Sequence, residues 1–304
     1  RCVRRPDGSA CLAGCRTERR SFQLPSHARH GTERGWRYRL CRCRWLAYDA
    51  SLRNMNHRIL AFEILPSTSD YLKENLSSLE DGVVVTAISQ SKGRGRRGRS
   101  WESSEGDLIF SLLLKDVSFP TLLPVLPLIS GVALSLALET YGVQPLIKWP
   151  NDLYLEGKKI AGILCEGIAE GEKQSAIVGI GANLASRPFP QDIAFKAESL
   201  GNLGYLIPKE ELLQTFLERF DTFVQLALAG QADWFPLLES RDYLKNQTVH
   251  LNYYGENLCG IAKGIASNGA LLVENNGQIK QVTSGEASLS PDSDNNKEKE
   301  LTHA

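Results

Sequence analysis

Apolar runs along the chain predict a set of short β-strands. β-branched and other apolar residues gather in short stretches bounded by Gly, Pro or polar residues, which is typical of strands buried on at least one face. In the N-terminal and central parts, the expected strands are residues 59–65, 83–89, 107–115, 146–149, 160–168 and 175–181. Glu156-Gly157-Lys158 predicts a hairpin turn ahead of the strand at 160–168.

Apolar residues at helical spacing predict three helices. The clearest covers residues 209–229 and ends at Gly230, and its apolar face carries Leu213, Leu217, Phe220 and Val224. Residues 66–70 offer N-capping side chains to a second helix, whose apolar face carries Leu72, Leu76 and Leu79. The third is expected at about residues 125–141, buried against the sheet.

The uncharged stretch 117–138 is long enough to raise the question of a transmembrane helix, which needs about 20 apolar residues. Pro120, Pro124 and Pro127 interrupt this stretch, and two serines dilute it. A buried helix is therefore the better explanation, and no membrane partner is expected.

After Trp234 the pattern changes to short strands split by Gly and Asn turns. These strands are expected at residues 248–254, 258–266, 270–274 and 278–283. They predict a small all-β module of about 50 residues, near the lower size for independent folding. The elements together predict an α+β chain with a mixed or antiparallel sheet. The expected domains are 55–238, 239–290 and a polar, disordered tail at 291–304.

Residues 1–54 differ in composition from the rest. The chain has 35 Lys and Arg against 35 Asp and Glu, but residues 1–54 hold 13 arginines, no lysine, four acids and five of the seven cysteines. A zinc site at Cys11, Cys15, Cys41 and Cys43 would have poor ligand spacing, and a targeting peptide would carry more serine. Since Met55 is the only methionine, residues 1–54 are expected to be a disordered extension outside the functional protein. The two cysteines beyond it suggest a reducing, cytoplasmic location without disulfides.

Residues 93–101, Gly-Arg-Gly-Arg-Arg-Gly-Arg-Ser-Trp, are the leading candidate for a functional loop. The glycines allow tight bending, and the guanidinium groups carry forked donors suited to phosphate or carboxylate. They predict a flexible cationic loop that an anionic ligand would order. A dinucleotide fingerprint would open a helix, whereas a strand is expected here, and the Gly-Lys-Ser/Thr of a P-loop is missing. A short Arg/Gly patch for nucleic acid stays open.

Two further segments carry candidate chemistry. Residues 148–153 read Lys-Trp-Pro-Asn-Asp-Leu and are followed by Lys-Lys-Ile-Ala-Gly-Ile-Leu at 158–164. A carboxylate at the strand end, in Asn151-Asp152, can meet a metal or a water. Residues 179–183, Gly-Ile-Gly-Ala-Asn, end a strand with glycines that permit close approach and an amide that can read a base edge.

Taken together, these segments resemble the biotin protein ligase family, and the likeness runs from about Phe62 to Leu289. Residues 284–289, Ser-Gly-Glu-Ala-Ser-Leu, resemble the end of that family's C-terminal domain. The resemblance implies a class II synthetase-like catalytic domain followed by a small SH3-like β-barrel. It also implies a ligase that makes biotinyl-5′-AMP and pyrophosphate from biotin and ATP. A lysine of a carboxylase carrier domain then takes the biotinyl group.

The resemblance also implies roles for individual residues. Biotin would contact Ser67, Thr68, Ser69, Gln90, Arg94, Gly95, Arg96, Lys159 and Gly162. Where the family usually has Ser-Thr-Asn, this chain ends the triplet with Ser69. ATP and the adenylate would contact Arg94, Arg96, Arg99, Trp101, Asn151, Lys159 and Asn183, with the tryptophan stacking on adenine and Asn183 reading it. Lys159 and Arg96 would face the reacting carboxylate and α-phosphate, and Asp152 would take a catalytic role associated with Mg²⁺.

Two other functions remain open. Lipoate–protein ligases share the fold and reaction type, and an arginine loop that grips RNA belongs to a different class of protein. The expected partner is the biotin carboxyl carrier protein of acetyl-CoA carboxylase. Residues 1–54 show no paired amphipathic helices, so a monofunctional ligase without a DNA-binding domain is expected. A homodimer stays open.

Overall fold

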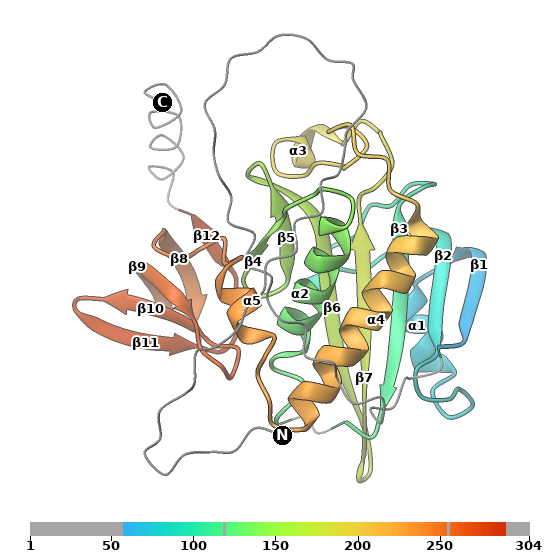
Figure 1. The fold of residues 1–304 in the computed structure, drawn as a ribbon, viewed down its shortest axis with the longest axis horizontal. Helices are drawn as coiled ribbons and strands as arrows, with labels where there is room; N and C mark the ends of the chain where they lie inside the picture. Colours follow the sequence, from blue (N-terminus) through green and yellow to red (C-terminus); the bar gives the residue numbers. More distant parts are fainter. Residues whose placement is uncertain (1–56, 118–119, 254–255, 290–304) are drawn as a thin grey trace, which may run out of the picture. The chain divides into compact units, whose positions relative to one another are not determined.

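Most of the chain is built around one large mixed sheet. The computed structural model describes residues 57–117, 120–253 and 256–289. Seven strands pair in the order β1-β2-β3-β7-β6-β5-β4 (Figure 1). Their bounds are β1 (Ile59–Leu65), β2 (Val84–Gln90), β3 (Leu108–Lys115), β4 (Leu146–Lys148), β5 (Asp152–Leu155), β6 (Lys158–Glu170) and β7 (Lys173–Ala182). β1 and β2 run parallel and the other neighbours antiparallel, which confirms the predicted mixed sheet.

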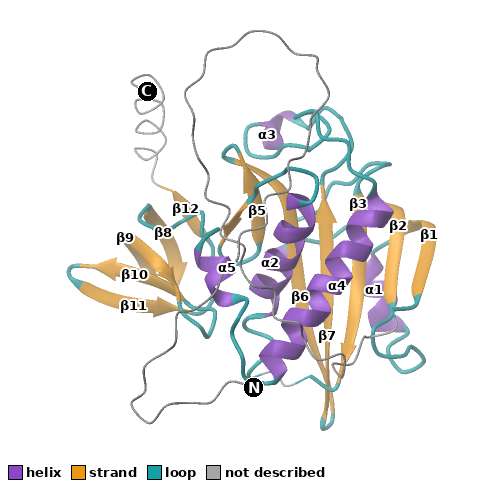
Figure 2. Cartoon of the chain, viewed as in Figure 1, coloured by secondary structure: helices purple, strands orange, loops and turns teal. Residues whose placement is uncertain are grey.

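The sheet separates two layers of helices. Helices α2 (Leu126–Glu139) and α4 (Lys209–Leu228) lie side by side over one face (Figures 1 and 2). Helix α1 (Thr68–Glu74) packs on the opposite face, as the alternation along β3 indicates. Leu112 belongs to the core cluster of α2 and α4, whereas Leu113 belongs to the cluster around α1. Since successive strand residues point to opposite faces, this alternation assigns each helix to its side.

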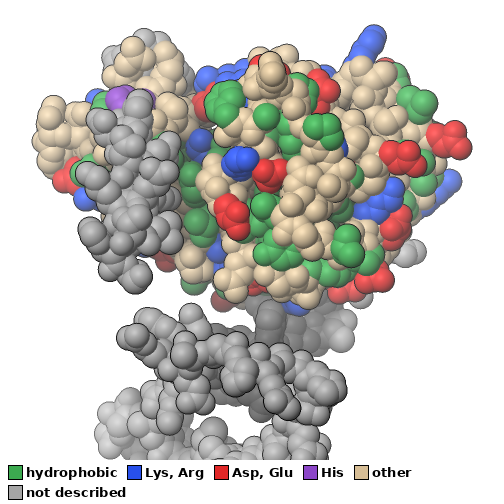
Figure 3. Space-filling view, turned by 90° about the horizontal axis from the view of Figure 1, so that it is seen from above, with side chains coloured by type: hydrophobic (Ala, Val, Ile, Leu, Met, Phe, Trp, Pro, Cys, Tyr) green, Lys and Arg blue, Asp and Glu red, His purple; other side chains and the backbone are tan. Residues whose placement is uncertain are grey.

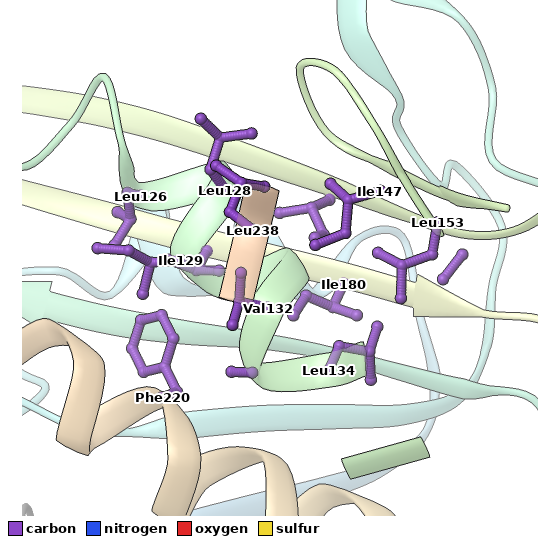
Figure 4. Packing of buried hydrophobic residues seen from close by; sticks show 14 of the residues in the cluster. Leu126, Leu128, Ile129, Val132, Leu134, Ile147, Leu153, Ile180, Phe220 and Leu238 are labelled. Carbon is purple, nitrogen blue, oxygen red and sulfur yellow. The ribbon is translucent and has the colours of Figure 1, made fainter. Parts of the chain in front are cut away.

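The larger core cluster forms between α2, α4 and the sheet. Figure 4 shows Ile129 and Val132 of α2 near Phe220 of α4 and Ile180 of β7. Each of these four side chains is at most 3% exposed. α2 is apolar around most of its circumference, which is typical of a helix covered on all sides rather than on one face.

A second, antiparallel sheet follows in the chain, with the strand order β11-β10-β9-β8-β12. Its strands are β8 (Thr248–Tyr253), β9 (Glu256–Ile265), β10 (Leu271–Asn275), β11 (Gln278–Val282) and β12 (Ala287–Leu289). Trp149, 2% exposed, joins the two sheets, because its indole Nε1 donates to the carbonyl oxygen of Gly269 at 2.9 Å.

The structure departs from the sequence-based expectations in a few places. The helix expected to carry Leu72, Leu76 and Leu79 on one face ends at Glu74, so Leu76 and Leu79 pack from the turn and bend that follow it. The short strand β12 and the short helices α3 (Gln191–Ala194) and α5 (Phe235–Glu239) were not expected. The expectations for residues 1–54 and for the tail from 291 fall outside the described residues.

Within the described ranges, no helix combines the length and the apolar character needed to cross a membrane. Helix α2 confirms the buried helix expected at about 125–141. Cys165 and Cys259 are free thiols.

Candidate active site

One cavity of about 870 Å³ gathers the predicted site residues. Its walls come from the first turn of α1, the arginine loop (residues 93–101), the β4–β5 turn, the start of β6 and the end of β7. Every residue assigned by resemblance lines it: Ser67, Thr68, Ser69, Gln90, Arg94, Gly95, Arg96, Arg99, Trp101, Asn151, Asp152, Lys159, Gly162 and Asn183. Segments far apart in the sequence therefore converge on one site.

A cluster of buried hydroxyl groups forms one end of the cavity. The Thr68 hydroxyl donates to Gln90 Oε1 at 3.1 Å, and its oxygen lies 2.7 Å from the Ser111 hydroxyl. Ser69 Oγ lies 2.9 Å from the same Ser111 oxygen. A Cβ at Gly179 would come within 2.9 Å of Ser69 Oγ, so a glycine on β7 leaves room for this cluster. The arrangement can bind a small polar group through several donors and acceptors.

The arginine loop is folded back on itself. The Gly95 amide donates to the Arg99 carbonyl at 2.7 Å, and the Trp101 amide donates to the Gly93 carbonyl at 2.9 Å. Arg97 has φ 57° and Gly98 has φ 75°, left-handed backbone of the kind that glycine adopts readily and other residues rarely. A Cβ at Gly93 would lie 2.6 Å from the Trp101 carbonyl oxygen, so the close pairing of the two limbs requires glycine there.

The arginine side chains diverge from this loop toward different elements. Arg94 forms ion pairs with Asp70 at 2.7 Å and with Glu166 at 2.9 Å. Arg96 donates to Asn151 Oδ1 at 3.0 Å and to the Gly285 carbonyl oxygen at 3.1 Å. Its burial lowers the pKa of Arg96.

Arg99 pairs with Glu286, which follows the second sheet's β11. The hydrogen bond from Arg99 is the main cause that lowers the pKa of Glu286. The loop is therefore tied to α1 and β6 through Arg94, and to the C-terminal segment through Arg96 and Arg99.

The Lys159 ammonium group lies over the Trp101 ring, and both side chains line the cavity. Lys159 Nζ lies 2.8 Å from Asp152 Oδ1 and 5.5 Å from the centroid of the Trp101 ring. A Cβ at Gly181 would lie only 2.3 Å from Trp101 Cε2, and one at Gly162 only 2.9 Å from its Cζ3. Glycines on β6 and β7 thus let the indole lie directly against the sheet.

Asn183 occupies the other end of the cavity and is 3% exposed. Its Nδ2 donates to the Glu198 carbonyl oxygen at 3.0 Å, and its Oδ1 accepts from Arg187 Nη2 at 3.3 Å. Phe189 and Ile193 add apolar surface to the same region of the cavity lining.

Sequence reasoning missed several residues that shape this site. Ser111 carried a usable signal, since it is a lone polar residue inside the apolar strand predicted at 107–115. Glu286 lies within segment 284–289, which resembles the end of the family's C-terminal domain, but that resemblance gives it no role. Glu166 and Arg187 stand out by no local pattern, because their partners come from distant parts of the chain.

The charges and shapes of the cavity suit an anionic, partly apolar ligand. Four arginines of the loop (Arg94, Arg96, Arg97 and Arg99) and Lys159 line it together with Trp101 and the buried hydroxyl cluster. The described residues include no group of three or more His, Cys, Asp or Glu side chains placed to hold a metal ion.

Comparison with known families gives two matches along the chain. The sequence model described as "Biotin/lipoate A/B protein ligase family" matches residues 61–183, which contain most of the cavity. The model described as "Biotin protein ligase C terminal domain" matches residues 246–290, which contain the second sheet.

Individual relatives agree with this assignment. The Bifunctional ligase/repressor BirA of Escherichia coli is 31% identical over 236 residues, which cover 76% of this chain and 74% of the relative. The Biotin--[acetyl-CoA-carboxylase] ligase of Paracoccus denitrificans is 31% identical over 204 residues, 64% of this chain and 85% of that one. A solved structure of biotin protein ligase from Aquifex aeolicus in complex with biotin and ATP superposes with a TM-score of 0.69 and 33% identity, covering 77% of this chain and 98% of that chain. Sequence motifs, fold and cavity thus agree, and this chain is a member of the biotin protein ligase family.

Proposed function

We propose that this chain is a biotin–protein ligase that activates biotin with ATP and transfers it to a carrier lysine. The observation that carries the proposal is the convergence of all residues matching the family's motifs on one cavity. The Aquifex aeolicus relative, which was solved with biotin and ATP, supports both substrates for this site.

In the first step the biotin carboxylate attacks the α-phosphorus of ATP, and pyrophosphate leaves. Both reactants are anionic, so the site must offset their repulsion as negative charge builds on the phosphate oxygens. Lys159 and Arg96 are the cations proposed for this task. Asp152, at 2.8 Å from Lys159 Nζ, would hold the ammonium group in place until the substrates arrive.

Biotin is an apolar bicycle with a ureido group, which offers two N–H donors and one carbonyl acceptor. We assign the ureido group to the hydroxyl cluster, because Ser67, Thr68, Ser69 and Gln90 all reach that end of the cavity. Buried hydroxyls can both donate and accept, so they match a group that presents both. The valeryl chain would then run past Trp101 toward Lys159, over the part of the sheet that contains Gly162 and Gly181.

In the second step the amine of a carrier lysine attacks the acyl carbon of biotinyl-5′-AMP. AMP leaves, the nitrogen loses a proton, and an amide forms. Because the mixed anhydride is prone to hydrolysis, it must be covered until the carrier arrives. The arginine loop is proposed as this cover, and the contacts of Arg96 with Asn151 and with the Gly285 carbonyl oxygen would hold it down.

Magnesium would enter with the nucleotide as part of the substrate. Mg²⁺ is commonly bound by one or two carboxylates together with substrate phosphates. The described residues offer no three-ligand cluster, so the phosphates would be the main ligands and Asp152 the carboxylate beside them. The ion would screen the charge of the phosphates.

Biotin is favoured over lipoate because residues 246–290 match the C-terminal domain of biotin protein ligases. A nucleic-acid-binding role is disfavoured because Arg94, Arg96 and Arg99 are engaged within the protein. On the face shown in Figure 3, basic side chains are mixed with acidic ones instead of forming a continuous patch. The proposed acceptor is the biotin carboxyl carrier protein of acetyl-CoA carboxylase, as the name of the Paracoccus denitrificans relative suggests.

The test is to incubate the protein with MgATP, a carrier domain and either biotin or lipoate. We expect the carrier to become labelled by biotin on a streptavidin blot, with no competition from a tenfold excess of lipoate. A carrier that stays unlabelled, or is labelled preferentially by lipoate, would overturn the proposal.

A further inference from the structure

A buried ion pair contacts Asn183, the cavity residue proposed to face the base of ATP. Arg187 Nη2 lies 3.1 Å from Asp107 Oδ2, and the two side chains are only 14% and 1% exposed. The other carboxylate oxygen of Asp107 accepts from the amides of Leu184 and Ala185 at 3.0 and 3.1 Å. The guanidinium carbon also sits 4.6 Å from the ring centroid of Phe189. Arg187 is therefore held on two sides, by a carboxylate and by an aromatic ring.

This fixed guanidinium sets the polarity of the Asn183 side chain. Arg187 Nη2 donates to Asn183 Oδ1, while Asn183 Nδ2 donates to the Glu198 carbonyl oxygen. In the opposite orientation the amide NH₂ would face a cation and the amide oxygen would face a carbonyl oxygen. Both contacts would be repulsive, so the amide is held in one orientation.

The oriented amide has one hydrogen and one lone pair left for a ligand. An asparagine amide used in this way pairs with a base edge that offers a donor beside an acceptor. Adenine has such an edge, because its 6-amino group stands next to ring nitrogens that accept. A 6-oxopurine such as hypoxanthine presents an acceptor where adenine has its amino group, so the amide oxygen would meet another oxygen.

We infer that Arg187 is a positioning residue that fixes the Asn183 amide and thereby makes the site select adenine over 6-oxopurine nucleotides. The inference rests on the proposed function, in which Asn183 faces the base of ATP. Arg187 would thus determine nucleotide specificity without touching the base, through its contact with Asn183.

The experiment compares ATP with ITP in biotin-dependent nucleotide–pyrophosphate exchange. A well-formed contact of this kind discriminates against a wrong base by about ten- to a hundredfold, so we expect the wild-type protein to prefer ATP by about that factor in kcat/KM. In Arg187→Met the preference should fall about tenfold through a higher KM for ATP, with the KM for biotin unchanged. In an Asn183→Ala background, adding Arg187→Met should change the preference no further, because the group that it orients is gone.

Arg241→Met is the matched control, since Arg241 is similarly shielded and pairs with Glu139 at 2.6 Å outside the cavity. It should keep the wild-type preference.

If Arg187→Met lowered kcat/KM for ATP and for ITP by the same factor, Arg187 would have only a structural role and the inference would fail. Should Arg187→Met not fold, Arg187→Gln takes its place, because a neutral amide can face either end of the Asn183 amide. A fall in the ATP-to-ITP ratio in that variant supports the inference, and an unchanged ratio overturns it. A wild-type protein without any exchange would instead refute the proposed function, whereas equal exchange with both nucleotides would refute the inference alone.

Discussion

Adding one methyl group at Gly181 should displace the wall of the active site. The new Cβ would lie 2.3 Å from Trp101 Cε2, so the ring would have to retreat by about 1.2 Å to regain an ordinary carbon–carbon contact of about 3.5 Å. The Trp101 amide is bonded to the Gly93 carbonyl within the arginine loop, so a retreat that carries the Trp101 backbone also moves the loop. The loop and the cavity face of Trp101 should therefore shift together.

The expected cost of Gly181→Ala has two parts. Overpacking of a tightly fitted site lowers the free energy of unfolding by about 1–3 kcal/mol. A misplacement of catalytic groups by about 1 Å can cost about a hundredfold in rate, so kcat/KM for ATP should fall by about ten- to a hundredfold. Urea denaturation measures the first part and biotin-dependent ATP–pyrophosphate exchange the second. Tryptophan fluorescence reports the displacement of Trp101.

Gly131→Ala is the control for this substitution. A Cβ there would meet Ile147 Cγ2 at 3.5 Å, an ordinary contact, and alanine is favoured over glycine inside a helix such as α2. This variant should keep wild-type activity and unfold at the same or a higher urea concentration. If Gly181→Ala folded normally and kept wild-type kcat/KM and fluorescence, the packing of Trp101 against the sheet would not matter for the reaction.

Side-chain contacts of Arg96 and His57 give two further predictions. Arg96→Gly removes the contacts that hold the loop down, so free biotinyl-5′-AMP should accumulate in solution, and retention of the intermediate at the wild-type level would contradict the covering role. Burial of His57 opposes its protonation, but its hydrogen bonds to Asp221 and to the Gly82 carbonyl outweigh burial and raise its pKa above 6.5. Protonated His57 therefore stabilises the folded state fully below pH 6.5. This contribution to the free energy of unfolding is lost as the pH rises through the raised pKa of His57. Urea unfolding between pH 5 and 9 should show this loss of stability in the wild type and a flatter pH profile in Asp221→Asn. Identical profiles of the two proteins would show that the His57–Asp221 pair does not contribute to stability.

Local patterns in the sequence predict most of the strands because each depends on neighbouring residues. The strand expected at 59–65 and the hairpin turn at Glu156-Gly157 both form as predicted, the turn with positive φ at both residues. The second helix was predicted too long, since Leu76 and Leu79 keep helical spacing but pack against the sheet from turns. Spacing alone does not reveal where a helix ends.

The site was predictable to the extent that it resides in contiguous motifs. The arginine loop and the segments at 148–153 and 158–164 are contiguous in the sequence, and each of them contributes residues to the lining of one cavity. Ser111 joins Thr68 and Ser69 only because the register of β3 against β7 sets Ser111 opposite Gly179. Such long-range contacts depend on how the strands pair in the folded sheet. Local patterns in a single sequence therefore do not predict them.

The claim that the cavity activates biotin is tested most directly by two adjacent lysines. Lys159 lines the cavity beside Asp152, whereas Lys158 pairs with Glu198 at 2.9 Å and does not line it. In biotin-dependent ATP–pyrophosphate exchange, Lys159→Met should lose about a hundredfold or more in kcat, because a cation at the reacting phosphate is removed. Lys158→Met should exchange at nearly the wild-type rate. Equal activity of the two variants would contradict the account.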